Sequence, residues 1–148
     1  MGTAAPQRDS GPGFERLVLF DGVCGFCDRT IRWLVERDPE GRLCFAPLQG
    51  DAADALRQRH PEIPKGIDSL VYIDASDGAE RIYLRSEAIL RVWAVVDPAN
   101  PWLRVLRRLP RRLADLAYAI FVRLRYRIFG RLAACRVPTP AERSRFID

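Results

Sequence analysis

Short apolar runs alternate with helical patterns through the first two thirds of the chain. Four runs predict strands at residues 16–20, 43–48, 69–74 and 79–84. Apolar positions at helical spacing predict helices at residues 24–37, 51–59 and 86–96, the last with Ser86 as its N-cap. Asp77 and Gly78 lie between the third and fourth runs, and so short a connection permits only antiparallel pairing. The order βαβαββα predicts an α/β fold built on a mixed sheet.

Two further helices are predicted after Pro101, at residues 102–109 and 111–129, with Pro110 between them. The longer one carries two apolar stripes on roughly opposite faces. One consists of Leu113, Leu116, Ala117, Ile120, Leu124 and Ile128, and the other of Tyr118, Val122, Tyr126 and Phe129. The commonest cause of such a pattern is packing against the helix's own domain and a partner subunit.

The chain of 148 residues is long enough for one hydrophobic core. Residues 1–13 are rich in Gly, Pro, Ala and Ser, so we expect a disordered leader there. This stretch has no apolar run and matches neither a signal peptide nor a membrane span. We therefore expect a cytoplasmic chain with its core at residues 14–100 and a basic helical extension, packed on the same domain, at residues 101–148.

The positive charge is concentrated in the predicted C-terminal helices. The formal net charge is +5, and residues 102–131 contain nine Arg and one Asp, so the rest of the chain is net acidic. Clustered Arg attracts acidic proteins, anionic lipid and nucleic acid alike. Docking at an anionic membrane surface explains the apolar and the basic positions together, whereas no scaffold for specific nucleic-acid binding is evident. The oligomeric state stays open.

Cys24 and Cys27 form a CxxC pair between the first predicted strand and the first turn of the next helix. Backbone N–H groups and the helix dipole at that position stabilise a thiolate on Cys24, which is the expected nucleophile. Cys27, one turn later, is expected to resolve the mixed disulfide. The pair predicts a thiol–disulfide oxidoreductase that acts on protein or small-molecule disulfides without a bound cofactor.

Asp21 lies at the exit of the first predicted strand, three residues before Cys24. A part-buried carboxylate here can take up or return the proton of the resolving thiol. An Asp-Gly pair at a strand end is equally typical of a turn or a helix cap. Both roles stay open for Asp21.

The alternative is a zinc-binding or interaction module whose cysteines are structural and whose basic helices dock a partner or a membrane. Zinc would need further ligands from Cys44, Cys135 or His60, but no second closely spaced pair accompanies the CxxC motif, and we assign no metal ligand. Cys44 lies in an apolar strand pattern and is expected to pack in the core. Packing is also the expected role of Cys135, and none is assigned to His60.

The stretch Phe20-Asp21-Gly22-Val23-Cys24-Gly25-Phe26-Cys27 resembles the signature of the DCC family. Residues 46–49, 85–88, 125–127 and 129–131, with Cys135 and residues 138–140, are similar to further blocks of that family. The resemblance implies a thioredoxin-like fold and thiol–disulfide oxidoreductase activity. Within the second block, Arg85 and Ser86 are candidates for binding an acidic group of the substrate, with a solvated charge beside the helix as the alternative for Arg85.

Two positions depart from the expected patterns. Leu124 stands where the family usually has Asn before Arg-Tyr. Thioredoxins carry a cis-Pro before the third strand, beside the active site, whereas this chain has Asp68 and Ser69 there. Because an extended partner chain pairs with that loop in thioredoxins, the sequence leaves the substrate-docking surface open.

Overall fold

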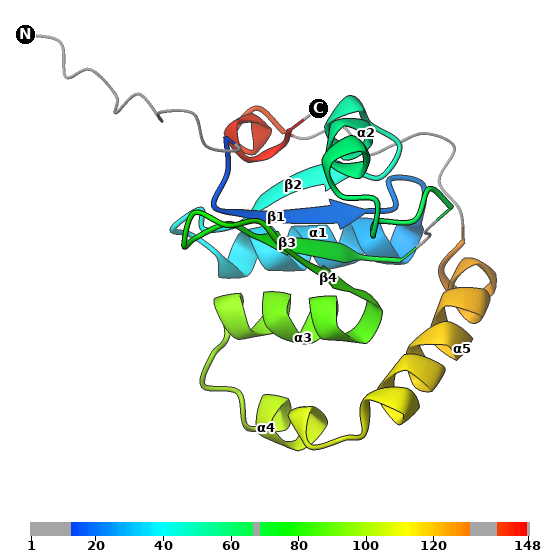
Figure 1. The fold of residues 1–148 in the computed structure, drawn as a ribbon. Coiled ribbons are helices and arrows are strands. Elements are labelled where there is room, and N and C mark those ends of the chain that lie inside the picture. Colours follow the sequence, from blue (N-terminus) through cyan, green and yellow to red (C-terminus); the bar gives the residue numbers. More distant parts are fainter. Residues whose placement is uncertain (1–12, 67–68, 131–138, 148) are drawn as a thin grey trace, which may run out of the picture.

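The structure is a computed structural model that describes residues 13–66, 69–130 and 139–147. Its centre is a four-stranded sheet made of β1 (Arg16–Phe20), β2 (Cys44–Pro47), β3 (Val71–Asp74) and β4 (Arg81–Leu84). The strand order is β2-β1-β3-β4, with β2 parallel to β1 and the other two pairs antiparallel. The mixed sheet confirms the predicted thioredoxin-like α/β fold (Figure 1).

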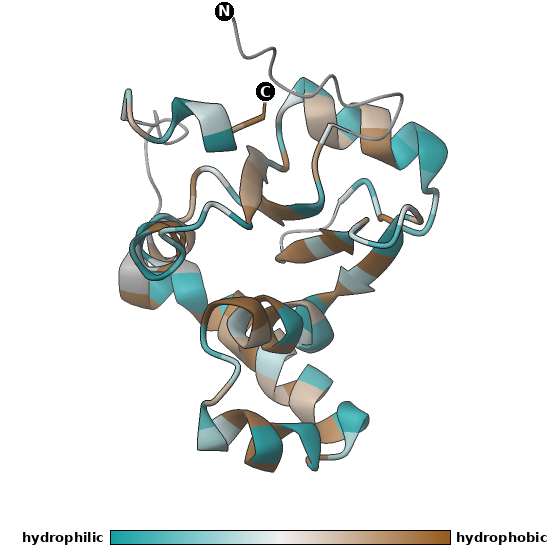
Figure 2. Cartoon of the chain, turned by 90° about the vertical axis from the view of Figure 1, so that its left-hand side faces the viewer, coloured by the Kyte–Doolittle hydropathy of each residue, from teal (hydrophilic) through white to brown (hydrophobic). Residues whose placement is uncertain are grey.

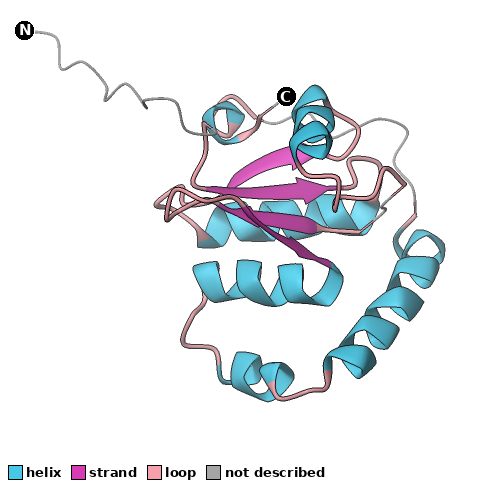
Figure 3. Ribbon diagram, in the orientation of Figure 1, coloured by secondary structure: helices cyan, strands magenta, loops and turns pink. Residues whose placement is uncertain are grey.

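Helices cover both faces of this sheet (Figure 3). They are α1 (Gly25–Arg37), α2 (Asp51–Arg59) and α3 (Arg85–Val96). Successive residues of β1 point to opposite faces, so Leu17 and Leu19 pack with α2, whereas Val18 and Phe20 pack with α1 and α3. The strands are largely apolar (Figure 2) because both of their faces are covered.

The C-terminal part adds α4 (Pro101–Arg107), α5 (Arg111–Phe129) and a short 3₁₀ helix (Arg143–Arg145). In Figure 1, α4 lies beyond α3, and α5 runs along the side of the molecule, where it contacts α1 and α3. None of the described helices combines the length and the apolar character needed to cross a membrane. The expected leader lies outside the described residues except for Gly13, and the boundary near residue 100 stays a prediction.

The start of α3 differs from the prediction. The helix begins at Arg85, with Leu84 as N-cap and no capping side chain, so the prediction of Ser86 as N-cap is wrong. The hydroxyl of Ser86 instead donates a hydrogen bond to Oδ1 of Asp115 in α5, at 2.5 Å. The Ser86 hydroxyl, which the local pattern predicted to cap the helix, is therefore used in a tertiary contact.

Candidate active site

Cys24 lies at the junction of β1 and α1, where it is the N-cap of the helix. Its Sγ accepts a hydrogen bond from the backbone N–H of Cys27, with 3.4 Å between nitrogen and sulfur. The N–H groups of a first helical turn have no partner within the helix, and they favour negative charge at this point. Cys24 has no solvent-exposed surface, so this sulfur lies beneath other parts of the molecule.

Cys27 lies one turn into α1 and differs from Cys24 in its surroundings. Burial, a hydrogen bond with Cys24 and the charge of Cys24 raise the pKa of Cys27 to about 12. The positive charge of Arg125 acts in the opposite direction, and the negative charge of Asp21 adds to the rise in this pKa. Cys27 therefore holds its proton more strongly than an ordinary thiol.

A buried ion pair joins Asp21 to Arg125 of α5. Nη2 of Arg125 donates to Oδ2 of Asp21 at 3.0 Å, and both side chains are almost completely buried. Nη1 of the same guanidinium lies 3.7 Å from Sγ of Cys27. Arg125 thus connects the carboxylate of Asp21 with the second thiol of the motif.

The other carboxylate oxygen of Asp21 holds the local loop. Oδ1 accepts hydrogen bonds from the N–H of Val23, at 3.1 Å, and from Nε2 of Gln49, at 2.9 Å. Oε1 of Gln49 in turn accepts the N–H of Gly22 at 3.1 Å. The turn role expected of Asp21 is therefore present, and the same carboxylate also faces the dithiol through Arg125.

Helix α5 lies across the CxxC turn. The rings of Phe26 and Phe121 make an edge-to-face contact, with their centroids 4.7 Å apart. The N–H of Gly25 donates to the carbonyl oxygen of Gly130 at 3.5 Å. These contacts, together with the ion pair of Arg125, hold the inner face of α5 against the CxxC turn, in which Cys24 is buried.

The loop before β3 is also in contact with α5. The N–H of Leu70 donates to the hydroxyl of Tyr118 at 3.2 Å, and Ser69 is buried beside it. This is the loop to which thioredoxins bind an extended partner chain. Here the hydroxyl of Tyr118 accepts the backbone N–H of Leu70, so strand-like pairing through this N–H would have to break that hydrogen bond.

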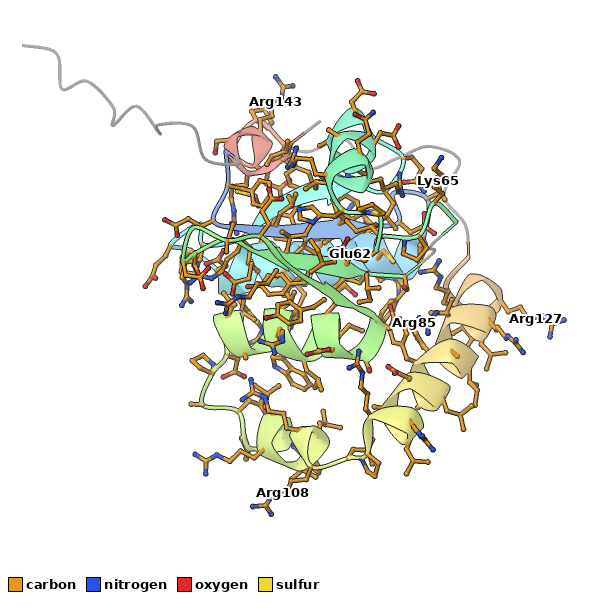
Figure 4. The ribbon with its side chains drawn as sticks, viewed as in Figure 1. Glu62, Lys65, Arg85, Arg108, Arg127 and Arg143 are labelled. Atoms are coloured by element: carbon orange, nitrogen blue, oxygen red, sulfur yellow. The ribbon has the colours of Figure 1, made fainter. Side chains whose placement is uncertain are left out.

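The two residues expected to bind substrate, Arg85 and Ser86, line different pockets beside Tyr118. Arg85 is exposed (Figure 4), and with Ser69 and Tyr118 it lines a groove of about 360 Å³. Ser86 is joined to Asp115 of α5. Substrate binding by Arg85 and Ser86 stays a prediction.

Three side chains around the dithiol were not predicted from the sequence as parts of the site: Arg125, Gln49 and Phe121. A signal was present for Arg125, because it follows Tyr118 and Val122 at helical spacing and so lies on the inner face of α5. A charged residue within such a face is buried only when it is paired. The partner is distant in sequence, and the helix alone does not reveal it.

The other candidate metal ligands were Cys44, Cys135 and His60, of which the structure describes Cys44 and His60. Within the part of the chain that the structure describes, no three side chains of His, Cys, Asp or Glu come close enough to hold a metal ion. Cys44 is half-buried in β2 and packs against the core, as predicted. Cys135 lies outside the described residues.

Comparison with known proteins places the chain in a family. The model of the DCC1-like thiol-disulfide oxidoreductases matches residues 18–131, which include both cysteines, Asp21 and Arg125. The chain belongs to this family. The resemblance seen in the sequence is thereby confirmed, and the family name describes the chemistry of a dithiol.

Two relatives of this DCC1-like chain come from distant organisms. It is 32% identical over 135 residues to "Uncharacterized protein YuxK" of Bacillus subtilis (strain 168), covering 90% of this chain and 94% of that protein. It is 30% identical over 122 residues to "DCC family protein At1g52590, chloroplastic" of Arabidopsis thaliana, covering 82% of this chain and 69% of that protein. No solved structure matches the chain significantly.

Proposed function

We propose that this protein is a thiol–disulfide oxidoreductase in which Cys24 attacks the substrate disulfide and Cys27 resolves the intermediate. The observation that carries the proposal is the difference between the two sulfur atoms. Cys24 lies at the start of α1 and accepts the N–H of Cys27, whereas the pKa of Cys27 is raised to about 12. The first sulfur thus lies at a helix N-terminus, where a backbone N–H points to it, while burial raises the pKa of the second.

The reaction consists of two exchanges. The Cys24 thiolate forms a bond to one substrate sulfur, and the substrate S–S bond breaks and releases a thiolate that takes up a proton. Cys27 then loses its proton and attacks Sγ of Cys24, which forms the Cys24–Cys27 disulfide and releases the second substrate thiol. Two electrons pass from the dithiol to the substrate, and the reverse sequence oxidises a substrate dithiol.

The second exchange needs a route for the proton of Cys27. We assign its acceptance to Asp21, the buried carboxylate whose charge acts on Cys27. Arg125 is a positioning residue, because its guanidinium pairs with Asp21 and lies beside Sγ of Cys27. Its positive charge stabilises the Cys27 thiolate at the moment when the proton leaves.

A redox titration in glutathione buffers tests the proposal, with free thiols counted by mass tagging and zinc measured in the same samples. We expect Cys24 and Cys27 to close reversibly into a disulfide without metal. Cys24→Ser should abolish turnover of a model disulfide, and Cys27→Ser should accumulate the mixed disulfide on Cys24. Cys44→Ser is the matched control, because Cys44 is a half-buried thiol in β2 outside the motif.

Two results would overturn the proposal. One is equal turnover by the unaltered protein, Cys24→Ser and Cys27→Ser. The other is a pair that stays reduced across the titration and retains one zinc ion per chain, which would favour the structural alternative.

A further inference from the structure

Exposed apolar side chains lie along α4, α5 and the turn between them. All large apolar side chains that are strongly exposed in the described part of the chain lie there, with exposed fractions from 41% to 65%. They are Trp102, Val105, Leu109, Leu113, Leu116, Ile120, Leu124 and Ile128. We call these eight residues the apolar stripe.

The geometry of α5 separates this surface from the catalytic one. From Leu113 to Ile128 the stripe residues of α5 recur every three or four positions, which places them on one helix face. Phe121 and Arg125 point inward to the dithiol and form a different face. Helix α5 therefore packs on the domain through the face that carries Phe121 and Arg125, and the apolar stripe is a separate, exposed face of the same helix.

Basic side chains accompany the apolar stripe. The exposed ones on these helices are Arg104, Arg107, Arg108, Arg111, Arg112, Arg123 and Arg127. Arg108 and Arg127 extend away from the body of the molecule (Figure 4). The single acid between residues 101 and 130 is Asp115, which is held by Ser86 and lies 3.8 Å from Arg111. Apolar and hydrophilic residues thus share the outer helices, as the colours of α4 in Figure 2 show.

We propose that the apolar stripe and its arginines dock on an anionic phospholipid surface. A helix that lies in the membrane interface buries its apolar face at the level of the headgroups, and basic side chains beside that face bind anionic lipid. Both features are present on α4 and α5, and neither contributes to the site that holds Cys24.

A second copy of the chain fits this surface less well. Two stripes in contact would bring the exposed arginines of each copy toward one another, and the nearby acids Asp115 and Glu87 already pair with Arg111 of the same chain. Like charges within a few ångströms repel, and the apolar contact would have to exceed that repulsion. An anionic lipid surface supplies the missing negative charge.

Vesicle flotation with the full chain tests the proposal. We expect binding to vesicles of phosphatidylglycerol and phosphatidylcholine, a smaller bound fraction at high salt, and no binding to phosphatidylcholine alone. Arg127→Glu should weaken the affinity about tenfold or more, since each Arg near an anionic surface contributes roughly 1 kcal/mol. Arg143→Glu is the matched control, because it makes the same charge change in the C-terminal 3₁₀ helix.

Two further measurements test the role of the apolar side chains. Ile120→Ser should lower the bound fraction severalfold while leaving the far-ultraviolet spectrum and the redox titration of the dithiol unchanged. Trp102 is 65% exposed, so its fluorescence should shift to the blue on anionic vesicles, and Trp102→Phe should remove that shift.

The proposal is overturned if anionic vesicles do not bind the chain, or if Arg127→Glu and Arg143→Glu weaken binding equally. Equal binding to neutral vesicles overturns the role of the arginines. A concentration-dependent dimer that Ile120→Ser dissociates, without vesicle binding, would show that a second copy covers the stripe.

Discussion

Cys24 and Cys27 lie within one turn of the chain, yet different neighbours control their sulfur atoms. Cys24 is governed by the start of α1, a local feature that its position in the sequence predicts. Cys27 is governed by burial and by the charges of Cys24, Arg125 and Asp21. The first sulfur thus interacts with its own turn, whereas the charges that act on the second include Arg125 of a helix about a hundred residues away.

Replacement of Arg125 tests this long-range control. Arg125→Met should lower the free energy of unfolding by about 3–5 kcal/mol, because it leaves the buried carboxylate of Asp21 without its cation. It should also raise the pKa of Cys27 further, measured as the pH dependence of Cys27 alkylation in the Cys24→Ser background. Arg125→Lys should cause smaller changes in both the free energy of unfolding and the pKa of Cys27, because Lys keeps the positive charge.

The control is Arg123→Met, which removes an exposed guanidinium two residues away on the same helix. If both Met variants give the same unfolding free energy and the same alkylation profile, Arg125 does not act on the dithiol.

The raised pKa of Cys27 has a consequence for stability at alkaline pH. Below pH 9 the folded and unfolded chains both keep this proton; between pH 9 and about 12 the unfolded chain releases it and the folded chain does not. The free energy of unfolding should therefore fall as pH rises through this range, by up to about 1 kcal/mol per pH unit from this group.

Denaturant unfolding of the reduced protein at pH 8, 9 and 10 measures that slope. Burial also raises the pKa of Tyr72 and Tyr118, so part of the slope should persist in any cysteine variant. Cys27→Ala should flatten the dependence relative to the unaltered protein, and Cys44→Ala should leave it unchanged. A Cys27→Ala slope equal to that of the unaltered protein would contradict the assignment.

At the scale of the elements, we expect α5 to control access to Cys24. The edge-to-face contact of Phe26 with Phe121 contributes roughly 0.5–1.5 kcal/mol beyond the buried area. Phe121→Ala should therefore favour displacement of the helix, and the alkylation rate of Cys24 should rise severalfold or more. Ile120→Ala, next to it but 52% exposed, should leave that rate unchanged in the absence of lipid. An unaltered rate in Phe121→Ala would mean that reagents reach Cys24 by another route.

The elements also show how far the sequence predicts this structure. β1, α2 and α5 begin and end at the predicted residues, because apolar spacing, Gly and Pro are local signals. The CxxC pair and Asp21 were found by the same kind of reasoning. The N-cap prediction for Ser86 was wrong, and no role was predicted for Arg125, because each is bound by a residue of another element, Asp115 and Asp21 respectively. Hydroxyl and guanidinium groups have several possible partners, and only the tertiary fold selects one.

At the scale of the whole molecule, the C-terminal residues close the edge of the sheet beside β2. Arg145 donates to the buried carboxylate of Asp38 at 2.5 Å, and the N–H of Ile147 donates to the carbonyl oxygen of Phe45 at 2.8 Å. The ring of Phe146 lies 6.2 Å from that of Phe20 and 5.5 Å from that of Phe45, between centroids. The end of the described chain thus packs on the strand that leads into the active site.

Phe146 should therefore stabilise the whole fold. Phe146→Ala should lower the free energy of unfolding by about 2 kcal/mol, at the low end for a Phe because this side chain is half-buried. Arg143→Ala, exposed three residues earlier, should change it by less than about 0.5 kcal/mol. Both changes in the free energy of unfolding are measured by denaturant unfolding monitored by circular dichroism. Equal values for the two variants would mean that the C-terminal residues lie on the sheet without stabilising it, and that the core beneath β1 and β2 is complete without them.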